Sequence, residues 1–537
     1  MNVVTVVGVF ALFGCALSAS VNTGSVYCSK RKCTFKADIL DPDSTAYGVF
    51  NDTIESRGWG ILELRAGLKK PPSDDDIMFA AGYLEGLLTT ERIYQNYLNL
   101  KPIFWDRVPK VTEKKIIQFL KDHISWTKQM IEKSAGHDPF WRQVSYVMAQ
   151  LDGLVEGYNV KAAYDHKIDY IRMFTLSASG DMMSIAMAVS PELYPDFTNM
   201  TRDEVERYVF SRSRCSALVK VTDDYSDLLM GHSTWFMYQS MMRIYKYYTI
   251  HLSDKASVIG RMSFSSYPGF LVSIDDFYVM ADTSMVMIQT TNSIFNKTMY
   301  SAIHPQSLLA WQRVRVANMM SNSGSQWADA LATHHSGTYP NQYMVVDLKL
   351  FKPNVELEDN LLWVVEEIPD LVMAADQTQI LRNGYWSSYN VPFYEKIYNL
   401  SGYPDIVKMK GLDFSYQMAP RAKIFRRDHG KVNSVKTIQE ILRSNDYKND
   451  PFSEGNPCKA ICCRGELRKE APFLGGCIDT KVTSFKMAED CAASIISGPT
   501  TASNIPPFHW GKKYANVSHI GLPEEFNFDF FNVFATI

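Results

Sequence analysis

The chain has 537 residues, which is enough for a large buried core and, by length alone, for two to four domains. Its formal net charge is −3 and no long block of like charge occurs, which excludes the clustered basic face typical of nucleic-acid binding. Aromatic residues make up 13% of the chain and favour a rigid interior rich in strands.

The first twenty residues are apolar and end in small residues, a pattern that predicts a secretory signal peptide over residues 1–20, cleaved near Ser18 or Ser20. An uncleaved anchor is the alternative, but the run is short for a span and has no basic flank. No later segment has the ~18 uninterrupted apolar residues of a membrane helix. We therefore expect the secretory pathway, with the lysosome or the extracellular space as destination, and no integral membrane span.

Two further features fit an oxidising secretory compartment. Glycosylation is predicted at the five N-x-[ST] sequons, Asn51, Asn199, Asn296, Asn399 and Asn516. Disulfide candidates outside the signal peptide are Cys28, Cys33, Cys458, Cys462, Cys463, Cys477 and Cys491, with Cys28 and Cys33 as the obvious local pair. If Cys215 stays free, these seven leave at least one more cysteine unpaired. The C-x3-C-C spacing fits no standard zinc site, so we predict no metal and no cofactor.

Periodicity then divides the chain into a helical part and a strand-rich part. Residues 21–70 mix short strand-like runs with turns. Apolar residues recur at helical spacing from Asp74, from Glu113 to about Lys133, and from about Val144 to Leu154. Strands are predicted at residues 215–221, 270–274, 285–288, 343–348 and 361–365. This order of elements indicates an α+β protein.

A cysteine opens the first strand-like run of the second part. Cys215 follows the basic segment 211–214, and His232 and Trp235 come seventeen and twenty residues later. A thiol at the start of a strand with a histidine nearby can form a nucleophilic site. The alternative is that Cys215 is a small buried apolar residue.

Other polar motifs are weaker. Adjacent His334 and His335 would point to opposite faces, which disfavours a shared metal site. Asp275 and Asp276 could orient a catalytic group, or could form a solvated turn. Residues 383–390 combine aromatics with two amides and suit a pocket wall or an oxyanion donor. Arg421 would ordinarily be a surface charge.

Seven blocks together resemble one known family. They are R-C-S-A-L (214–218), H-S-T-W (232–235), Y-P-G with S-I-D-D-F-Y (267–278), S-G-T-Y-P-N-Q (336–342), G-Y-W-S-S-Y-N (384–390), P-R-A-K-I-F-R (420–426) and G-G-C-I-D-T-K-V-T (475–483). The chain is similar, from about residue 45 to its end, to the phospholipase B-like family of lysosomal N-terminal-nucleophile hydrolases.

The resemblance implies an αββα sandwich of two mostly antiparallel sheets flanked by helices. It also implies a precursor that cuts itself between Arg214 and Cys215. The N-terminal fragment (residues 21–214) would be partly helical, pack on the core and be open to trimming on maturation. The C-terminal fragment (residues 215–537) would carry the nucleophile and most of the core, and both fragments would stay in one body.

The cut has a chemical purpose. In the precursor the Cys215 nitrogen is an amide and cannot act as a base. An N-to-S acyl shift breaks the Arg214–Cys215 bond and releases an α-amine with an unperturbed pKa near ~7.7–8.0, well matched to a thiol near ~8.5. The mature enzyme would attack an acyl carbonyl, form a thioester on Cys215 and hydrolyse it with water.

By resemblance, His232 would tune the ionisation of Cys215, Asn390 would stabilise the oxyanion, and Arg421 would hold the amine and the thiolate. Trp235 and Thr291 would be substrate-binding positions. The chain departs from the family pattern at Pro340, where a polar residue is common, and at Cys462 and Cys463, which look additional.

The predicted function is hydrolysis of acyl ester or amide bonds in phospholipids or N-acyl lipids, with no metal or cofactor. The expected partners are the lipid substrate, the two fragments of the chain itself and a second copy in a homodimer, but no nucleic acid. The alternative is a non-enzymatic luminal glycoprotein that binds lipid.

Overall fold

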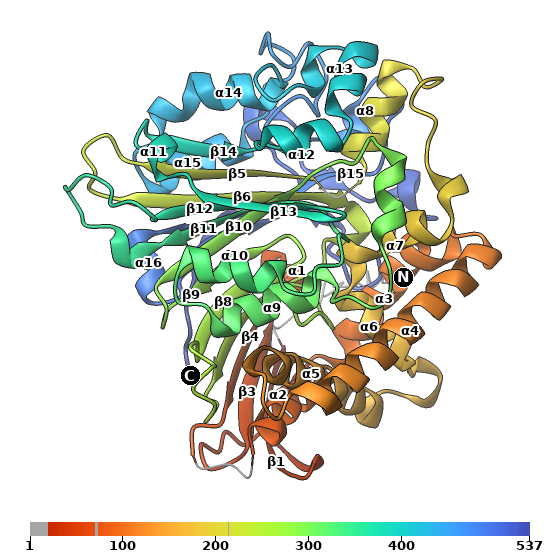
Figure 1. Ribbon diagram of the computed structural model, residues 1–537, viewed down its shortest axis with the longest axis vertical. Coiled ribbons are helices and arrows are strands. Elements are labelled where there is room, and N and C mark those ends of the chain that lie inside the picture. Colours follow the sequence, from red (N-terminus) through yellow and green to blue (C-terminus); the bar gives the residue numbers. More distant parts are fainter. Residues whose placement is uncertain (1–19, 70–72, 213) are drawn as a thin grey trace, which may run out of the picture.

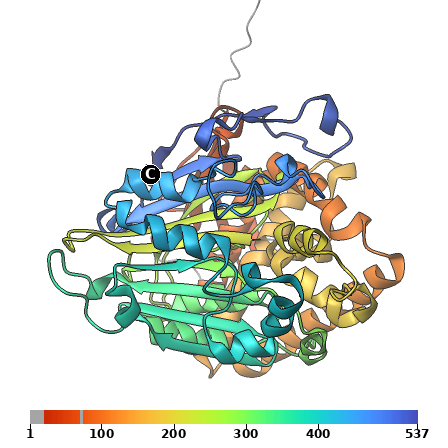
Figure 2. The same cartoon turned by 90° about the horizontal axis from the view of Figure 1, so that it is seen from above.

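The computed structural model describes residues 20–69, 73–212 and 214–537, so the predicted signal peptide lies outside the described residues except for Ser20. Two β-sheets lie face to face and helices cover both outer faces (Figures 1 and 2). This arrangement confirms the predicted α+β class and the αββα sandwich. None of the helices in these ranges is long and apolar enough to cross a membrane.

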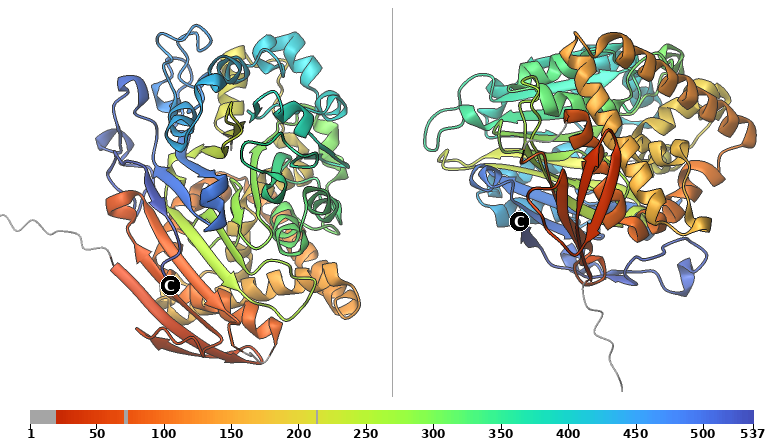
Figure 3. Two further views of the ribbon diagram at one scale, coloured as in Figure 1. Left: turned by 90° about the vertical axis from the view of Figure 1, so that its left-hand side faces the viewer. Right: turned by 90° about the horizontal axis from the view of Figure 1, so that it is seen from below.

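The larger sheet has eleven strands in the order β13-β12-β11-β10-β9-β8-β7-β4-β3-β1-β2. They are β1 (Ser20–Ser29), β2 (Lys32–Ala37), β3 (Ala46–Asp52), β4 (Trp59–Ala66), β7 (Arg243–Ile250), β8 (Arg261–Ser266), β9 (Phe277–Met280), β10 (Met285–Thr291), β11 (Asn341–Asp347), β12 (Leu362–Ile368) and β13 (Leu371–Asp376). All neighbours are antiparallel except β4 and β7, which pair in parallel. Residues before the expected cut thus supply four strands of this sheet, which extend it at one end (Figure 3).

The smaller sheet has six antiparallel strands in the order β14-β5-β6-β15-β16-β19. They are β5 (Arg214–Val221), β6 (Leu228–Met237), β14 (Tyr385–Ser388), β15 (Gly475–Ser484), β16 (Ala493–Ser497) and β19 (Phe531–Val533), and β17 (Phe508–His509) pairs separately with β18 (Glu525–Phe526). The chain ends beside the larger sheet, where the amide of Ile537 donates to Glu63 of β4 over 2.9 Å.

The helices form two layers. The layer on the larger sheet includes α2 (Asp74–Leu88), α4 (Lys110–Ser134), α5 (Pro139–Lys161), α9 (Ala310–Met320) and α10 (Gly324–Ala332), and the layer on the smaller sheet includes α8 (Arg202–Phe210), α13 (Tyr403–Lys410), α14 (Pro420–Asp428) and α15 (Val435–Arg443). The other α-helices are α1 (Ile54–Arg57), α3 (Thr90–Lys101), α6 (Tyr170–Ser177), α7 (Ser179–Val189), α11 (Thr378–Leu381), α12 (Glu395–Leu400) and α16 (Phe485–Glu489). The helices predicted from Asp74, Glu113 and Val144 correspond to α2, α4 and α5.

Alternation along β5 decides which side chains enter the space between the sheets. Ala217, Val219 and Val221 pack in the core that joins the two sheets, whereas Leu218 packs against the outer helices. Because side chains on a strand alternate between faces, Cys215 lies on the same face as Ala217. The sandwich therefore places the cysteine between the sheets.

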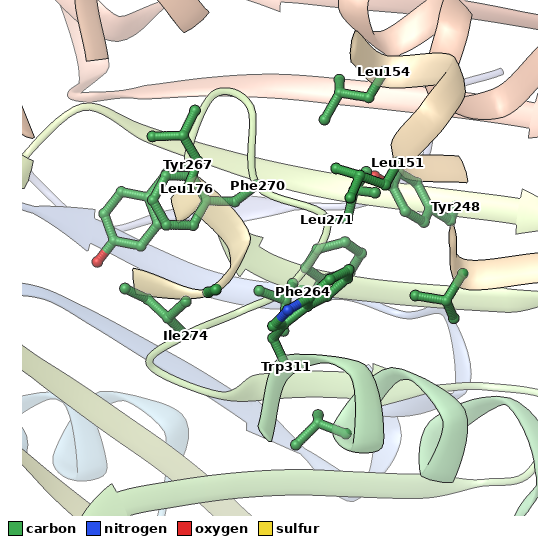
Figure 4. Close-up of a cluster of buried hydrophobic side chains, with 14 of the residues drawn as sticks. Leu151, Leu154, Leu176, Tyr248, Phe264, Tyr267, Phe270, Leu271, Ile274 and Trp311 are labelled. Carbon is green, nitrogen blue, oxygen red and sulfur yellow. The ribbon is translucent and has the colours of Figure 1, made fainter. Parts of the chain in front are cut away.

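One predicted strand is wrong. Residues 270–274 form the loop between β8 and β9, although Phe270 and Leu271 are buried. Figure 4 shows these two side chains in a cluster with Leu151 of α5 and Trp311 of α9. The apolar run therefore reflects a loop inserted into the core. The loop also carries Asp275, which is only 2% exposed, so the solvated turn was the wrong alternative.

The disulfides join Cys28 to Cys33, Cys458 to Cys463 and Cys462 to Cys477. Among the described cysteines, Cys215 and Cys491 are free. Including Cys491 among the disulfide candidates was therefore wrong: its thiol is buried in the core between the sheets, 3.8 Å from the carbonyl oxygen of Val279. The expectation that a second cysteine would be unpaired is confirmed.

The sequons differ in accessibility. Asn51 is half-buried in β3, which is paired on both sides, and its Oδ1 atom is buried, whereas Asn399 is exposed at the end of α12. Since a glycan needs open space, we expect Asn51→Gln to leave the electrophoretic mobility of the secreted protein unchanged and Asn399→Gln to remove one glycan. A glycopeptide carrying sugar on Asn51 would contradict this prediction.

Candidate active site

Cys215 is held at its own backbone by side chains from distant parts of the chain. The residue is fully buried near the start of β5, paired in register with Thr234 of β6. Its amide N–H donates to Oδ1 of Asn390 over 3.1 Å, and its carbonyl oxygen accepts from Nη1 of Arg421. The structure thus brings together three of the four residues predicted to be catalytic.

Arg421 lies in the first turn of α14 and points inward. Besides the Cys215 carbonyl, its guanidinium donates to the Ser216 hydroxyl (3.1 Å), the Tyr389 carbonyl (2.7 Å) and Oδ1 of Asn390 (2.8 Å). Burial lowers the pKa of Arg421 to about 9, so the group remains a cation at neutral and acidic pH. Arg421 is buried, so it is not the surface charge that an arginine would ordinarily be.

Asn390 follows β14 with φ of +68°, in the left-handed region that asparagine tolerates better than most residues. The Nδ2 atom of Asn390 donates to the Thr291 carbonyl over 2.6 Å, and the hydroxyl of Tyr403 donates to the backbone carbonyl of Asn390 over 2.9 Å. These bonds fix Oδ1 toward the nitrogen of Cys215. The Nδ2 donor, for which the resemblance predicts an oxyanion role, is therefore engaged by the Thr291 carbonyl in this structure.

The two predicted substrate-binding positions differ. Thr291, at the end of β10, lines a large cavity. Trp235 is fully buried: its indole N–H donates to the Ile461 carbonyl over 3.2 Å, and its ring lies 4.4 Å from the guanidinium carbon of Arg421. Trp235 therefore packs its ring against the guanidinium of Arg421.

His232 belongs to a buried polar cluster below Cys215. Its Nδ1 lies 3.0 Å from the ammonium of Lys481, which also contacts the Thr234 hydroxyl (2.5 Å) and the carboxylates of Asp275 and Asp479 (2.8 Å each). Burial and the Lys481 charge lower the pKa of His232 well below its usual value, so the ring is neutral. We call His232, Thr234, Arg243, Asp275, Asp479 and Lys481 the buried charge cluster; each is at most 2% exposed.

Sequence reasoning missed most of this cluster. Asp479 and Lys481 stand two residues apart in β15, an otherwise mostly uncharged buried strand, so they share one face. Two opposite charges at that spacing in a buried strand were a usable signal. Arg243, at the start of β7, lies 2.7 Å from Asp275 and 2.9 Å from Asp479 and gave no comparable local signal.

The surroundings oppose ionisation of the Cys215 thiol. Its pKa is raised to about 12, mainly by burial, with Asp275 acting in the same direction. Lys481, an N–H of Trp235 and Arg421 act in the opposite direction. The thiol is therefore protonated at neutral pH as long as the site is closed.

Two cavities lie near the Arg214–Cys215 bond: Arg214 lines the larger one, and Asn390 and Arg421, which contact Cys215, line the smaller one. The larger, about 730 Å³, is mainly apolar and includes Ile103, Phe104, Met182, Met187, Phe236 and Phe473 in its wall. The smaller, about 50 Å³, touches Asn390 and Arg421. Residues of α8 and the segment after it line both: Arg207 and Tyr208 face the larger cavity, and Val209 and Phe210 the smaller.

Arg214 itself is 4% exposed. Its guanidinium donates to the Val209 carbonyl (2.6 Å), the Thr291 carbonyl (3.3 Å) and the Ser293 hydroxyl. The residue before the expected cut is thus fixed as firmly as the residue after it.

Known proteins resemble this chain over most of its length. A family model described as Phospholipase B matches residues 46–533. The chain is 45% identical to Phospholipase B-like 1 of Bos taurus over 496 residues, covering 92% of this chain and 89% of that protein. It is 44% identical to Phospholipase B of Crotalus adamanteus over 518 residues, covering 95% and 92%. The chain belongs to the phospholipase B family.

Proposed function

We propose that this protein is an acyl hydrolase that cuts its own chain between Arg214 and Cys215 and then uses Cys215 as an amino-terminal nucleophile. The observation that carries the proposal is that Asn390 and Arg421 hold the two ends of the Cys215 backbone unit. Asn390 Oδ1 already accepts from the nitrogen that cleavage would turn into an α-amine. Any buried backbone unit needs hydrogen-bond partners, but here side chains from two distant segments supply them at both ends.

Self-cleavage would proceed as an acyl shift. The Cys215 sulfur attacks the Arg214 carbonyl carbon, the C–S bond forms and the C–N bond breaks. The thiol proton ends on the released nitrogen, and water then hydrolyses the thioester to free the Arg214 carboxylate and the thiol. The anchored guanidinium of Arg214 would hold the carbonyl in place during attack.

The mature reaction would reuse the same atoms. The α-amine accepts the thiol proton as sulfur attacks the acyl carbonyl, and the leaving alcohol or amine takes a proton as the thioester forms. Water hydrolyses the thioester to a free fatty acid. Arg421 would favour the thiolate, and Nδ2 of Asn390, once released by Thr291, would donate to the oxyanion.

The large cavity supports an acyl lipid as substrate. Its volume lies in the range of small-molecule sites and its wall is mainly apolar, as an acyl chain requires. The relatives' printed name, phospholipase B, points to phospholipids, while the same chemistry accepts N-acyl amides.

Both fragments would stay together after the cut. The parallel pair β4–β7 crosses the cleavage point in sequence, and so does the buried ion pair between Glu85 and Lys246 (2.6 Å). Trimming of residues before the cut would remove the wall that α8 and its following segment place between the two cavities. Passage through the secretory pathway would provide glycosylation and disulfides.

The substrate assignment is tested by narrowing the large cavity. Ala186→Phe places a ring in the cavity wall, so we expect kcat/KM on palmitoyl esters and amides to fall about tenfold or more, with butyryl substrates little affected. Ala188→Phe is the matched control, since this alanine lies on the same helix α7 and is also half-buried. Equal losses for both chain lengths would argue against acyl binding there, and binding without turnover would favour the lipid-binding glycoprotein.

A further inference from the structure

The buried charge cluster contains a lysine that the proposed mechanism does not use. Lys481 is fully buried, and a lysine ammonium has three protons to donate. Four acceptor atoms surround it, on His232, Thr234, Asp275 and Asp479. So complete a set of contacts fixes the ammonium beside the strand pair that carries Cys215.

We propose that Lys481 is the positioning residue that supplies the positive charge favouring the Cys215 thiolate. Its ammonium is held in place by Thr234 of β6, Asp275 and Asp479. The inference rests on the proposed nucleophilic role of Cys215. Lys481 would act by its charge alone and take no part in bond making or breaking.

Three residues could supply the positive charge near the Cys215 thiol, namely Lys481, His232 and Arg421, and their positions favour Lys481. Thr234, which Lys481 contacts, is the residue paired with Cys215 across β5 and β6. His232 cannot supply the charge, because its Nδ1 faces the lysine ammonium and the ring is neutral. Arg421 binds the carbonyl of Cys215, and its charge lowers the thiol pKa less than that of Lys481 does.

The charged and titratable groups around the thiol come from every neighbouring element. Those that act on the thiol are Arg214 on β5, Asp275 on the β8–β9 loop, Arg421 on α14 and Lys481 on β15, and those around these four are His232, Arg243, Asp276, Tyr389, Tyr403 and Asp479. Although burial alone would raise it, Arg243 and Lys481 hold the pKa of Asp275 below its usual value, so this carboxylate is ionised. Burial raises the pKa of Asp276 well above its usual value, so that group is neutral.

The charges of the buried charge cluster cancel, but their effects on the Cys215 thiol do not. Two cations, Lys481 and Arg243, face two anions, Asp275 and Asp479. The lysine charge acts on the thiol more strongly than the nearest anion does. Replacing Lys481 by a neutral residue therefore removes the largest of the charges that favour the Cys215 thiolate and leaves Asp275 to oppose it.

The test compares the alkylation rate of the Cys215 thiol at each fixed pH, because below the thiol pKa this rate follows the thiolate fraction. In a full-length Cys491→Ser background, iodoacetamide alkylation of Cys215 is followed by peptide mass spectrometry across pH, and conversion of freshly made precursor is followed in parallel. Removing a nearby positive charge raises the pKa of a thiol, typically by ~1–3 units. We expect that rise in Lys481→Met, with self-cleavage at neutral pH slowed about tenfold per unit.

Controls separate this effect from misfolding. Lys481→Met with Asp479→Asn keeps the cluster's net charge and should show the same rise, whereas Lys481→Arg should stay close to the parent protein. Lys220→Met removes another buried lysine of the same sheet and should change neither readout. An unchanged alkylation profile in folded Lys481→Met or in the double variant would overturn the inference. A shifted profile in a chain that never cuts itself would support it while refuting the proposed self-cleavage.

Discussion

Replacing Cys215 with alanine is expected to leave the chain in one piece and to abolish acyl hydrolysis. Both steps of the proposed mechanism require the same sulfur, first to attack Arg214 and then to attack the substrate. The side chain is fully buried and small, so alanine leaves little empty volume and the fold should persist. Loss of activity would then reflect chemistry, by several orders of magnitude, as for other covalent nucleophiles.

The measurement is intact mass with N-terminal sequencing of protein from a secretory expression system. The parent chain should yield a fragment that begins at Cys215, and Cys215→Ala should not. Cys491→Ala is the matched control, because Cys491 is the other free, buried cysteine of the described chain. A fragment starting at residue 215 in the alanine variant would show that a protease makes the cut.

Replacing Arg421 with methionine is expected to impair folding and processing together. Methionine keeps the apolar packing on Trp235 but leaves the Tyr389 carbonyl without the Arg421 donor and Oδ1 of Asn390 with the Cys215 N–H alone. Removing one partner of a buried charged contact typically costs about 3–5 kcal/mol. Because Asn390 and Cys215 share this donor, we also expect self-cleavage to be lost.

Urea denaturation and the fragment pattern test this prediction. Arg426→Met is the control, since Arg426 is exposed on the same helix and its loss should change the free energy of unfolding by about 0.5 kcal/mol or less. Arg421→Lys should rescue only part of the loss, because a point charge cannot reach four acceptors as a planar guanidinium does. Normal stability and cutting in Arg421→Met would exclude the role proposed for this residue.

Local pattern was sufficient for much of the architecture. Helical periodicity located α2, α4 and α5, and short apolar runs located β10, β11 and β12. Both signals arise because the buried face of a helix or strand requires apolar residues at regular positions. The method failed at residues 270–274. A buried loop and a buried strand can have the same apolar composition, and only the packing of Phe270 and Leu271 between helix and sheet distinguishes them.

The sequence by itself determined the cysteine at the head of a strand and, through the family resemblance, Asn390 and Arg421 as its companions, whereas the packing of β5 showed that the cysteine lies between the sheets. Only the tertiary structure decided which charges are buried around it. Lys481 lies 249 positions from His232 and 206 from Asp275 along the chain, yet each pair is in contact. Such contacts leave no local trace, because burial of an ion depends on the whole set of partners that satisfies it.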